Sequence, residues 1–298
     1  MIQLSCIHWV QLDEAIRQGI GQEHRMIPLK PGLEADVTRV ELNDQPYVLK
    51  IWNKESRPNI EQQYQLLQKL IQSGIQVSRP YGWGIDQHRN QVLLTSYDGV
   101  PVTRLDQEIL RQMAQTLHDI HQYPVRVKEP QTEEAKQDYI PRYHFVDYFF
   151  PQVAKHQDIH HIVHNLIKQV KIRQDHFIHG DYNLGNIVEM NGKYTIIDWT
   201  NGQYGDPRYD AAWSVFLITI YNGEEYGMFY QSELQAVAGN MLDEEEGFEA
   251  LAWLRWVLLS REGDVPRNSE VMRRVQHIAT HNFYLQACPK FSSSAYLW

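Results

Sequence analysis

The sequence is short of cysteine and has no long apolar segment. Cys6 and Cys288 are its two cysteines, too few for a disulfide framework, so we expect a protein of a reducing compartment. The amino terminus lacks the basic start and the small-residue cleavage site of a signal peptide. The most apolar run, around residues 211–221, is too short to cross a bilayer as a helix. We therefore expect a cytoplasmic protein with no membrane partner.

Positive charge is also scarce. The 28 lysines and arginines face 37 acidic residues, which gives a formal net charge of −9. Nonspecific nucleic-acid binding needs basic groups that neutralise phosphates, so this balance argues against a nucleic-acid partner. It favours a cationic partner instead. The sequence makes no prediction of the oligomeric state.

The first hundred residues have the pattern of a small β-rich lobe. Residues 36–42 and 45–52 alternate apolar and polar side chains on either side of Asn43-Asp44, which predicts a hairpin. A helical period begins after Pro58-Asn59, and a further strand is predicted over 91–96.

The period becomes helical from about Asp106, where Ile109, Met113 and Leu117 share one face. With 298 residues the chain is long enough for two lobes. We therefore predict an α+β fold in which residues 1–97 form a sheet-rich lobe and residues 98–298 a larger, mainly α-helical lobe.

The most informative stretch is His179-Gly-Asp-Tyr-Asn-Leu-Gly-Asn186. Asp181 and Asn186 are five residues apart, and Asp198 ends a predicted strand 17 residues after Asp181. Phosphoryl transfer from a nucleotide needs an oriented acceptor hydroxyl and Mg²⁺ held by oxygen ligands. Aspartate and asparagine side chains at this spacing can supply both.

These segments, together with Gly205-Asp-Pro-Arg-Tyr-Asp210, resemble the aminoglycoside phosphotransferase and choline kinase superfamily. The resemblance covers about residues 25–215. It implies a bilobal protein-kinase-like fold with a nucleotide-binding lobe over 1–97 and a catalytic and substrate-binding lobe over 98–298. It also implies an enzyme that transfers the γ-phosphate of ATP or GTP to an alcohol group.

The resemblance implies a role for each matching residue. Asp181 accepts or steers the proton of the acceptor hydroxyl, and Asn186 and Asp198 hold Mg²⁺. Lys50 pairs with the α- and β-phosphates. Asp206 and Asp210 are expected to brace the loops behind the site.

Further nucleotide contacts are implied in the first lobe. Glu61 is expected to orient Lys50, with Glu55 as the alternative, and Ser96 and Tyr97 to present backbone groups to adenine. Gly32 is the one glycine in the phosphate-covering loop expected around residues 29–37.

Other patterns have two interpretations. His156, His160 and His164 share a helix face that either binds a metal or is simply solvated, and the solvated face is favoured because the zincin glutamate is absent. The run 243–246 is either a solvated loop or helix start, or a surface for an amine-bearing substrate. Trp253 and Trp256 are expected in the core.

The acceptor is predicted to be a small hydroxyl-bearing, cationic molecule, with aminoglycoside antibiotics favoured. The alternatives are a choline, homoserine or amino-sugar kinase, a macrolide or peptide-antibiotic kinase, or a non-catalytic kinase-fold structural protein of the spore-coat type. The candidate acceptor-binding carboxylates are Glu224, Glu225, Asp243, Glu244, Glu245, Glu262 and Asp264.

Overall fold

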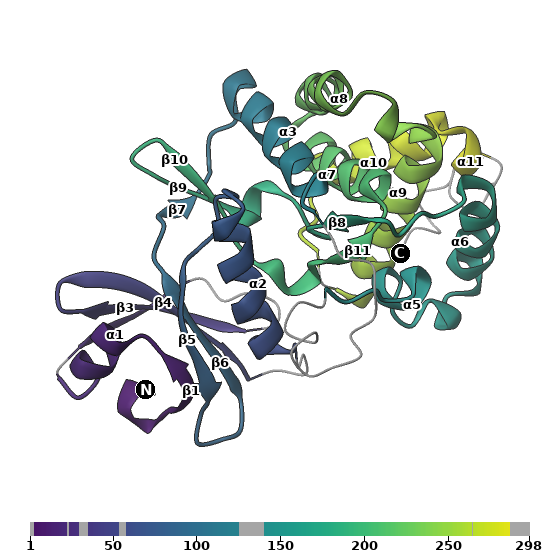
Figure 1. Cartoon of the computed structure of the whole chain (residues 1–298). Coiled ribbons are helices and arrows are strands. Elements are labelled where there is room, and N and C mark those ends of the chain that lie inside the picture. Colours follow the sequence, from purple (N-terminus) through teal and green to yellow (C-terminus); the bar gives the residue numbers. More distant parts are fainter. Residues whose placement is uncertain are drawn as a thin grey trace. The chain divides into compact units, whose positions relative to one another are not determined.

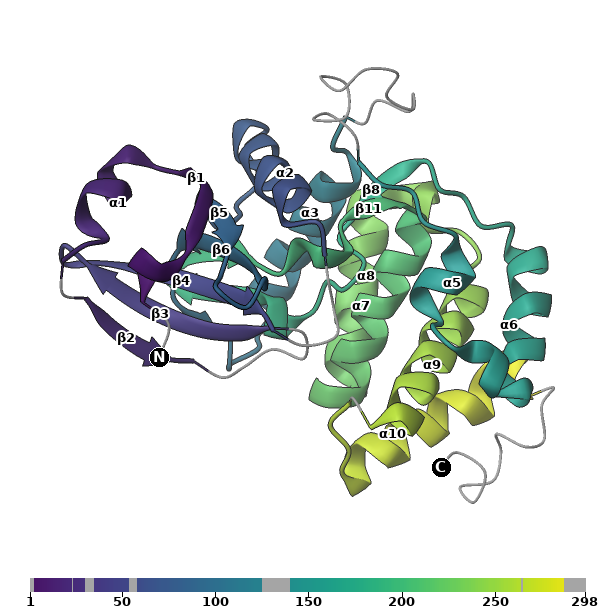
Figure 2. The same ribbon diagram turned by 90° about the horizontal axis from the view of Figure 1, so that it is seen from below.

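The computed structural model describes residues 3–22, 24–29, 35–53, 58–124, 140–263 and 265–286. The chain divides into two compact units that are both discontinuous in sequence. The first comprises Met1–Val102 and Ile187–Thr200, and the second Thr103–Asn186 and Asn201–Trp298. The predicted α+β class is confirmed (Figures 1 and 2). Within the described ranges, no helix has the length and apolar character needed to span a membrane.

The first unit is built on a six-stranded antiparallel sheet with the strand order β1-β5-β6-β4-β3-β2. Its strands are β1 (His8–Leu12), β2 (Arg25–Pro28), β3 (Asp36–Leu42), β4 (Gln45–Trp52), β5 (Pro80–Ile85) and β6 (Gln91–Ser96). Leu49 and Ile51 of β4 are buried in a cluster that includes Ile16 of α1 (Glu14–Gly19). Because side chains alternate along a strand, Lys50 points to the other face of the sheet.

Two local predictions for this unit are confirmed. Asn43 and Asp44 both have positive φ, 50° and 59°, as a tight turn between β3 and β4 requires. Helix α2 (Ile60–Gln72) begins after Asn59, whose side chain accepts a hydrogen bond from the amide of Gln62. The helix packs against β5 and β6.

A hairpin from much later in the sequence belongs to the same unit. Strands β9 (Ile187–Met190) and β10 (Lys193–Ile196) pair with each other, and β9 also pairs with the two-residue strand β7 (Val100–Pro101). The Ile196 amide donates to the carbonyl of Gln76 at 2.8 Å, which ties the hairpin to the segment between α2 and β5.

The second unit is mainly helical. Its longer helices are α3 (Gln107–His121), α6 (Gln157–Val170), α7 (Pro207–Asn222), α8 (Glu224–Ala238), α9 (Glu245–Glu262) and α10 (Ser269–His281), and its short helices are α5 (Phe145–Phe149) and α11 (Phe283–Gln286). The strands β8 (His176–Ile178) and β11 (Gln203–Gly205) pair antiparallel within it. Asp106 caps α3 at the predicted start of the helical region.

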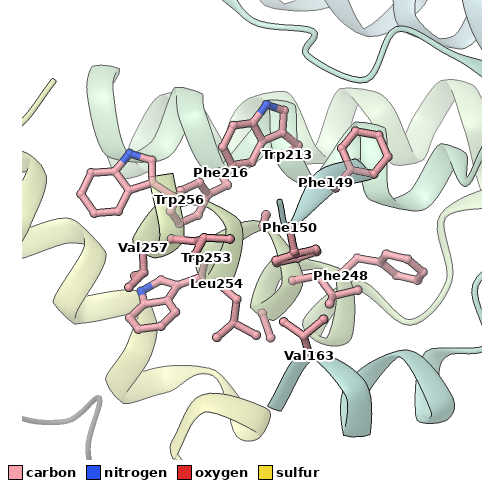
Figure 3. Packing of buried hydrophobic residues seen from close by; sticks show 14 of the residues in the cluster. Phe149, Phe150, Val163, Trp213, Phe216, Phe248, Trp253, Leu254, Trp256 and Val257 are labelled. Carbon is pink, nitrogen blue, oxygen red and sulfur yellow. The ribbon is translucent and has the colours of Figure 1, made fainter. Parts of the chain in front are cut away.

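The core of the second unit surrounds α9 (Figure 3). Residues 250–258 of this helix are buried on all of its sides, as is typical of a helix at the centre of a domain. Trp253 and Trp256 are fully buried there, so their predicted core position is confirmed. The core also supports α7, the helix that packs behind the His179–Asn186 segment.

Candidate active site

The His179–Asn186 segment follows β8 and is held by Asp210 of α7. One oxygen of Asp210 accepts the main-chain N–H of His179 and the other that of Gly180, both at 2.9 Å. His121 Nε2 lies 3.1 Å from Asp210 Oδ2. Burial acts to raise the pKa of Asp210, but the hydrogen bond and charge of His121, together with His179, outweigh it and lower that pKa. The predicted bracing role of Asp210 is therefore confirmed.

Gly180 adopts a backbone conformation that suits glycine alone at this place. Its φ is +79°, and a Cβ there would lie 2.8 Å from both Cβ and O of Asn201. A side chain would therefore be strained and would collide with its neighbour.

The Asp181 carboxylate accepts a hydrogen bond at each of its oxygens. Trp213 Nε1 of α7 donates to Oδ1 at 2.7 Å, and Asn186 Nδ2 donates to Oδ2 at 3.1 Å. The same Asn186 nitrogen donates to the Asp181 carbonyl at 2.9 Å. Since the amide nitrogen is committed to Asp181, the side-chain oxygen of Asn186 is the atom suited to a metal ion.

Two residues that contact this loop were missed by the sequence analysis. Trp213 is one, and Arg255 of α9 is the other, with Nη1 donating to the Gly180 carbonyl at 3.0 Å. Arg255 is the one charged residue in the buried run 250–258. A single arginine inside an apolar segment is the sequence feature that could have predicted a buried polar contact there.

In the first unit the structure brings Lys50 and Asp198 together. Lys50 Nζ lies 3.5 Å from Asp198 Oδ1, and the Lys50 side chain is 16% exposed. Asp198 has a φ of +63° and accepts a 2.6 Å hydrogen bond from Thr200 Oγ1. Glu61 lies exposed in the first turn of α2, and among the described residues no ion pair joins it to Lys50.

The predicted adenine-binding residues end β6. The Ser96 amide donates to the Arg79 carbonyl at 2.8 Å, and its hydroxyl donates to Asp98 at 2.8 Å. The Arg39 guanidinium lies 4.6 Å from the centre of the Tyr97 ring. The main-chain N–H of Ser96 therefore already donates within the sheet. Of the two residues predicted to bind adenine, Tyr97 is the one whose main chain stays the candidate.

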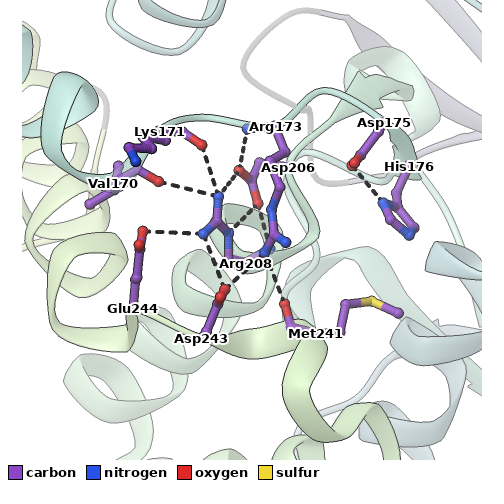
Figure 4. A network of polar contacts seen from close by, with 10 residues as sticks. All are labelled: Val170, Lys171, Arg173, Asp175, His176, Asp206, Arg208, Met241, Asp243 and Glu244. Atoms are coloured by element: carbon purple, nitrogen blue, oxygen red, sulfur yellow. Dashed lines mark hydrogen bonds and ion pairs between the residues drawn. The ribbon is translucent and has the colours of Figure 1, made fainter.

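Asp206 and Arg208 form a buried polar network at the start of α7 (Figure 4). Arg208 Nε and Nη2 bind the two oxygens of Asp206, and Nη2 also donates to the carbonyls of Val170 and Lys171. Asp206 further accepts the main-chain amide of Arg173 at 2.7 Å, which confirms its bracing role.

The acidic run after α8 contributes to this network. Asp243 pairs with Arg208 at 3.1 Å and with Arg173 at 2.8 Å, and Glu244 lies 3.2 Å from Arg208. Two of the candidate acceptor carboxylates thus have arginine partners inside the protein. The sequence predicted a solvated loop or helix start, or a substrate surface, for this run; α9 does begin at Glu245, but the pairing of Asp243 and Glu244 with arginine was not predicted.

The other candidate carboxylates are spread over three places. Glu224 lies 3.8 Å from Arg273, and Glu262 lies 3.0 Å from His156. Glu245 accepts hydrogen bonds from Gln231 and Gln235, while Glu225 is exposed at the start of α8. The structure does not gather these side chains into one group.

A cavity of about 120 Å³ lies between α7, α8 and α9. It has roughly ten times the space that one water needs. Its lining includes the apolar residues Val215, Phe216 and Leu234, the cation Arg208, and four carboxylates: Asp243, Glu245, Glu246 and Glu249. Burial raises the pKa of Glu249 against the hydrogen bond from Asn282, and the charges of Glu246 and Glu245 raise it further.

Two sets of predicted residues remain: the histidines of α6 and those residues that lie outside the described ranges. The rings of His160 and His164 on α6 are tilted by 58° with centres 4.3 Å apart. In the ranges described, no group of three or more side chains that could hold a metal ion was found. Gly32, Glu55, Asp264 and Cys288 lie outside the described residues.

Solved structures with the same fold include kinases and phosphotransferases of small molecules. An amicoumacin kinase matches 85% of this chain and 87% of its own with a TM-score of 0.62 and 15% identity. The aminoglycoside phosphotransferase APH(4)-Ia matches 91% and 95% with a TM-score of 0.62 and 13% identity. Choline kinase LicA from Streptococcus pneumoniae matches 88% and 93% with a TM-score of 0.59 and 18% identity. No curated protein sequence is significantly similar to the chain.

These likenesses define the protein-kinase-like fold that the sequence predicted. The sequence pattern described as the phosphotransferase enzyme family matches residues 25–256. The chain therefore belongs to the phosphotransferase enzyme family, as a small-molecule kinase that phosphorylates a hydroxyl group.

Proposed function

We propose that this enzyme transfers the γ-phosphoryl group of ATP or GTP to a hydroxyl of a small cationic molecule, with aminoglycoside antibiotics as the first candidates. The observation that carries the proposal is the Asp181 carboxylate, fixed at both oxygens on a loop whose backbone is held by buried Asp210. A carboxylate held in this way suits the base that orients an acceptor hydroxyl.

The reaction balances with the groups of the chain. The acceptor oxygen forms a bond to the γ-phosphorus as the bond from that phosphorus to the bridging oxygen breaks, and the nucleoside diphosphate leaves with the electron pair. The hydroxyl proton passes to the Asp181 carboxylate. The enzyme must release this proton before the next turnover. Asp181 is only partly buried, so the proton can pass from its carboxylate to solvent.

Asn186 and Asp198 are the proposed ligands of Mg²⁺. Both offer side-chain oxygens, which is the donor type that Mg²⁺ prefers. When bound, the ion neutralises charge on the transferring phosphates. Lys50 is proposed to pair with the α- and β-phosphates, which requires it to exchange its contact with Asp198 for the nucleotide. Tyr97 and Gly32 remain proposed nucleotide contacts, and Glu61 remains the residue proposed to orient Lys50.

A cationic acceptor is supported by the charge of the chain and by the cavity. The net charge is −9, and four carboxylates line the cavity between α7, α8 and α9, together with the single cation Arg208. An amine there would gain charge-assisted hydrogen bonds. Phosphorylation of aminoglycosides would make the enzyme a resistance factor. We place it in the cytoplasm, where ATP is available.

A small amino alcohol is the second candidate. Tyr143 and Tyr148 stack with ring centres 4.7 Å apart, and the Tyr148 hydroxyl donates to Asn201, the residue packed against Gly180. Tyr143 is 41% exposed, so an ammonium group can approach a ring close to the loop.

The test is a mass-spectrometric phosphorylation screen with Mg²⁺ and either ATP or GTP. The acceptors are aminoglycosides, macrolides, choline, ethanolamine, homoserine, amino sugars and cationic peptides. We expect one class of acceptor to gain the mass of one phosphoryl group, about 80 Da. In Asp181→Asn we expect turnover to fall by roughly 100- to 10,000-fold. Nucleotide binding, measured by thermal stabilisation, should persist in this variant.

Asp175→Asn is the matched control. Asp175 lies six residues before Asp181 and pairs with His176 at the surface, where its side chain is 56% exposed. It should keep full turnover. A wild-type rate in Asp181→Asn would exclude Asp181 as the base, and an absence of both product and nucleotide binding would favour a non-catalytic role.

A further inference from the structure

Trp213 makes a direct contact with the proposed base. Its indole Nε1 donates to Asp181 Oδ1 at 2.7 Å, and the residue is 3% exposed. An indole N–H is a donor only, so the direction of this hydrogen bond is fixed. A hydrogen bond to an ionised acceptor is about twice as strong as one between neutral groups.

The indole ring is itself held in place. The Arg255 guanidinium lies 4.2 Å from the centre of the Trp213 ring, and Phe216 stacks on the same residue at 6.2 Å with an angle of 18° between the rings. Figure 3 shows Trp213 and Phe216 within the core around α9. Since Arg255 also donates to the Gly180 carbonyl, one side chain supports both the indole and the loop that carries Asp181.

The hydrogen bonds to the two Asp181 oxygens come from different elements of the second unit. Asn186 belongs to the same loop as Asp181, whereas Trp213 is on α7 and 32 residues later in the sequence. Asn186 moves together with the loop that carries Asp181. Trp213 is on a buried helix, so its N–H fixes the carboxylate relative to the core of the unit. Trp213 therefore restricts the rotation of the carboxylate about its side-chain bonds.

We propose that Trp213 is a positioning residue for phosphoryl transfer: its indole N–H, supported by Arg255, holds the Asp181 carboxylate toward the acceptor hydroxyl. This inference rests on the proposed function, in which Asp181 is the base. Proton transfer depends strongly on geometry, and a displacement of about 1 Å can cost on the order of 100-fold in rate.

The test replaces only the donor. Trp213→Phe keeps an aromatic ring against Arg255 and removes the N–H. Transfer of the γ-phosphoryl group of ATP to water is measured with Mg²⁺ as phosphate release, because this reaction needs no identified acceptor. We expect kcat to fall by about 10- to 100-fold, while KM for ATP changes less than about 2-fold.

Trp256→Phe is the matched control. Trp256 is fully buried in the same core, and its Nε1 donates to the Tyr221 hydroxyl at 3.0 Å rather than to the loop. The two variants lose the same chemical group from the same core. If Trp213 has only a structural role, both should lower the melting temperature and neither should lower kcat selectively.

A double-mutant cycle with Asp181→Ala separates positioning from general damage. Without the carboxylate, Trp213→Phe should change the residual rate by less than about 2-fold, whereas independent effects would multiply. A fall in kcat of equal size in both backgrounds would overturn the proposal.

The contact can also be measured without activity. The indole N–H signal of Trp213, identified by its loss in Trp213→Phe, should shift in the ¹H–¹⁵N spectrum of Asp181→Ala, while that of Trp256 should not. An unmoved Trp213 signal would overturn the contact. If Asp181→Ala retains the wild-type rate, the proposed base fails instead, and the signal alone decides whether the contact exists.

Discussion

His121 and Asp210 are joined by a hydrogen bond of 3.1 Å that links α3 to α7 across 89 residues of sequence. Both side chains are buried, and the same carboxylate holds the main chain at His179 and Gly180. One buried acid thus connects two helices and the loop of the proposed base. The first prediction concerns its contribution to stability.

Asp210→Ala should destabilise the protein by about 3–5 kcal/mol, because it leaves His121 and two buried N–H groups without their acceptor. The free energy of unfolding in urea measures this. The control is Asp147→Ala, since Asp147 also pairs with a histidine, His144, but with side chains 82% and 67% exposed. It should change stability by about 0–1 kcal/mol. Equal effects of the two variants would contradict the bracing role.

Glu249→Gln should stabilise the protein at neutral and alkaline pH. Burial is the largest influence on the pKa of Glu249, and it raises this pKa. The hydrogen bond from Asn282 lowers it, and the charges of Glu246 and Glu245 raise it further. A raised folded-state pKa means that the native state binds the proton more tightly than the unfolded state. Protonation of Glu249 therefore increases the free energy of unfolding of the wild type as the pH falls through the folded-state pKa. This contribution is complete below the unfolded-state pKa.

The advantage of Glu249→Gln over wild type should accordingly shrink as the pH falls through the folded pKa. The glutamine oxygen can still accept from Asn282, whose Nδ2 lies 2.8 Å from Glu249 Oε2. Melting temperatures from pH 4 to pH 9 measure the difference. A difference that grows toward low pH has the wrong sign and would exclude a raised pKa.

Gly180→Ala should reduce both stability and turnover. The substitution adds a Cβ that meets Asn201 at 2.8 Å and places alanine at a φ of +79°. Gly192→Ala is the control, with a φ of +77° and no atom within 4 Å of the added Cβ. The control should cost only the backbone strain, about 1–2 kcal/mol.

Turnover and unfolding of the two glycine variants should be compared side by side. The excess destabilisation of Gly180→Ala over Gly192→Ala reports the collision with Asn201. If both variants lose the same stability and keep the wild-type kcat, the close packing behind the loop has no effect on catalysis.

Arg208→Met should cost about 3–5 kcal/mol, because it leaves the fully buried Asp206 without its charged partner. Arg273→Met removes an arginine whose side chain is 59% exposed and should leave the stability close to that of wild type, although Arg273 also has two acidic partners. Guanidinium denaturation would screen these charges, so urea is the suitable denaturant. Similar midpoints for the two variants would contradict a structural role for the buried network.

The local sequence predicted those parts of the fold whose signals are local. The Asn43-Asp44 turn, the Asn59 cap and the Asp106 cap each depend on side chains within three residues. The family resemblance singled out Asp181, Asn186 and Asp198 as proposed site residues because one loop and one hairpin fix their spacing along the chain.

Contacts between distant segments were not predictable in this way. Trp213 reaches Asp181 from another helix, and Arg255 reaches Gly180 from 75 residues away. Likewise, the charges of Asp243 and Glu244 indicated an exposed or substrate-binding run, because the partner that explains them, Arg208, is recognised only once α7 and the following loop are folded.

The pairing of β7 with β9 has a consequence for how the protein is made. Val100 pairs with Glu189, 89 residues later in the chain. At about 5–20 residues per second, a ribosome takes roughly 4–18 s to synthesise that interval. During this time β7 has been made but its partner strand β9 has not, while the first helices of the other unit are already emerging. Neither unit can be cut out as one continuous piece of the gene.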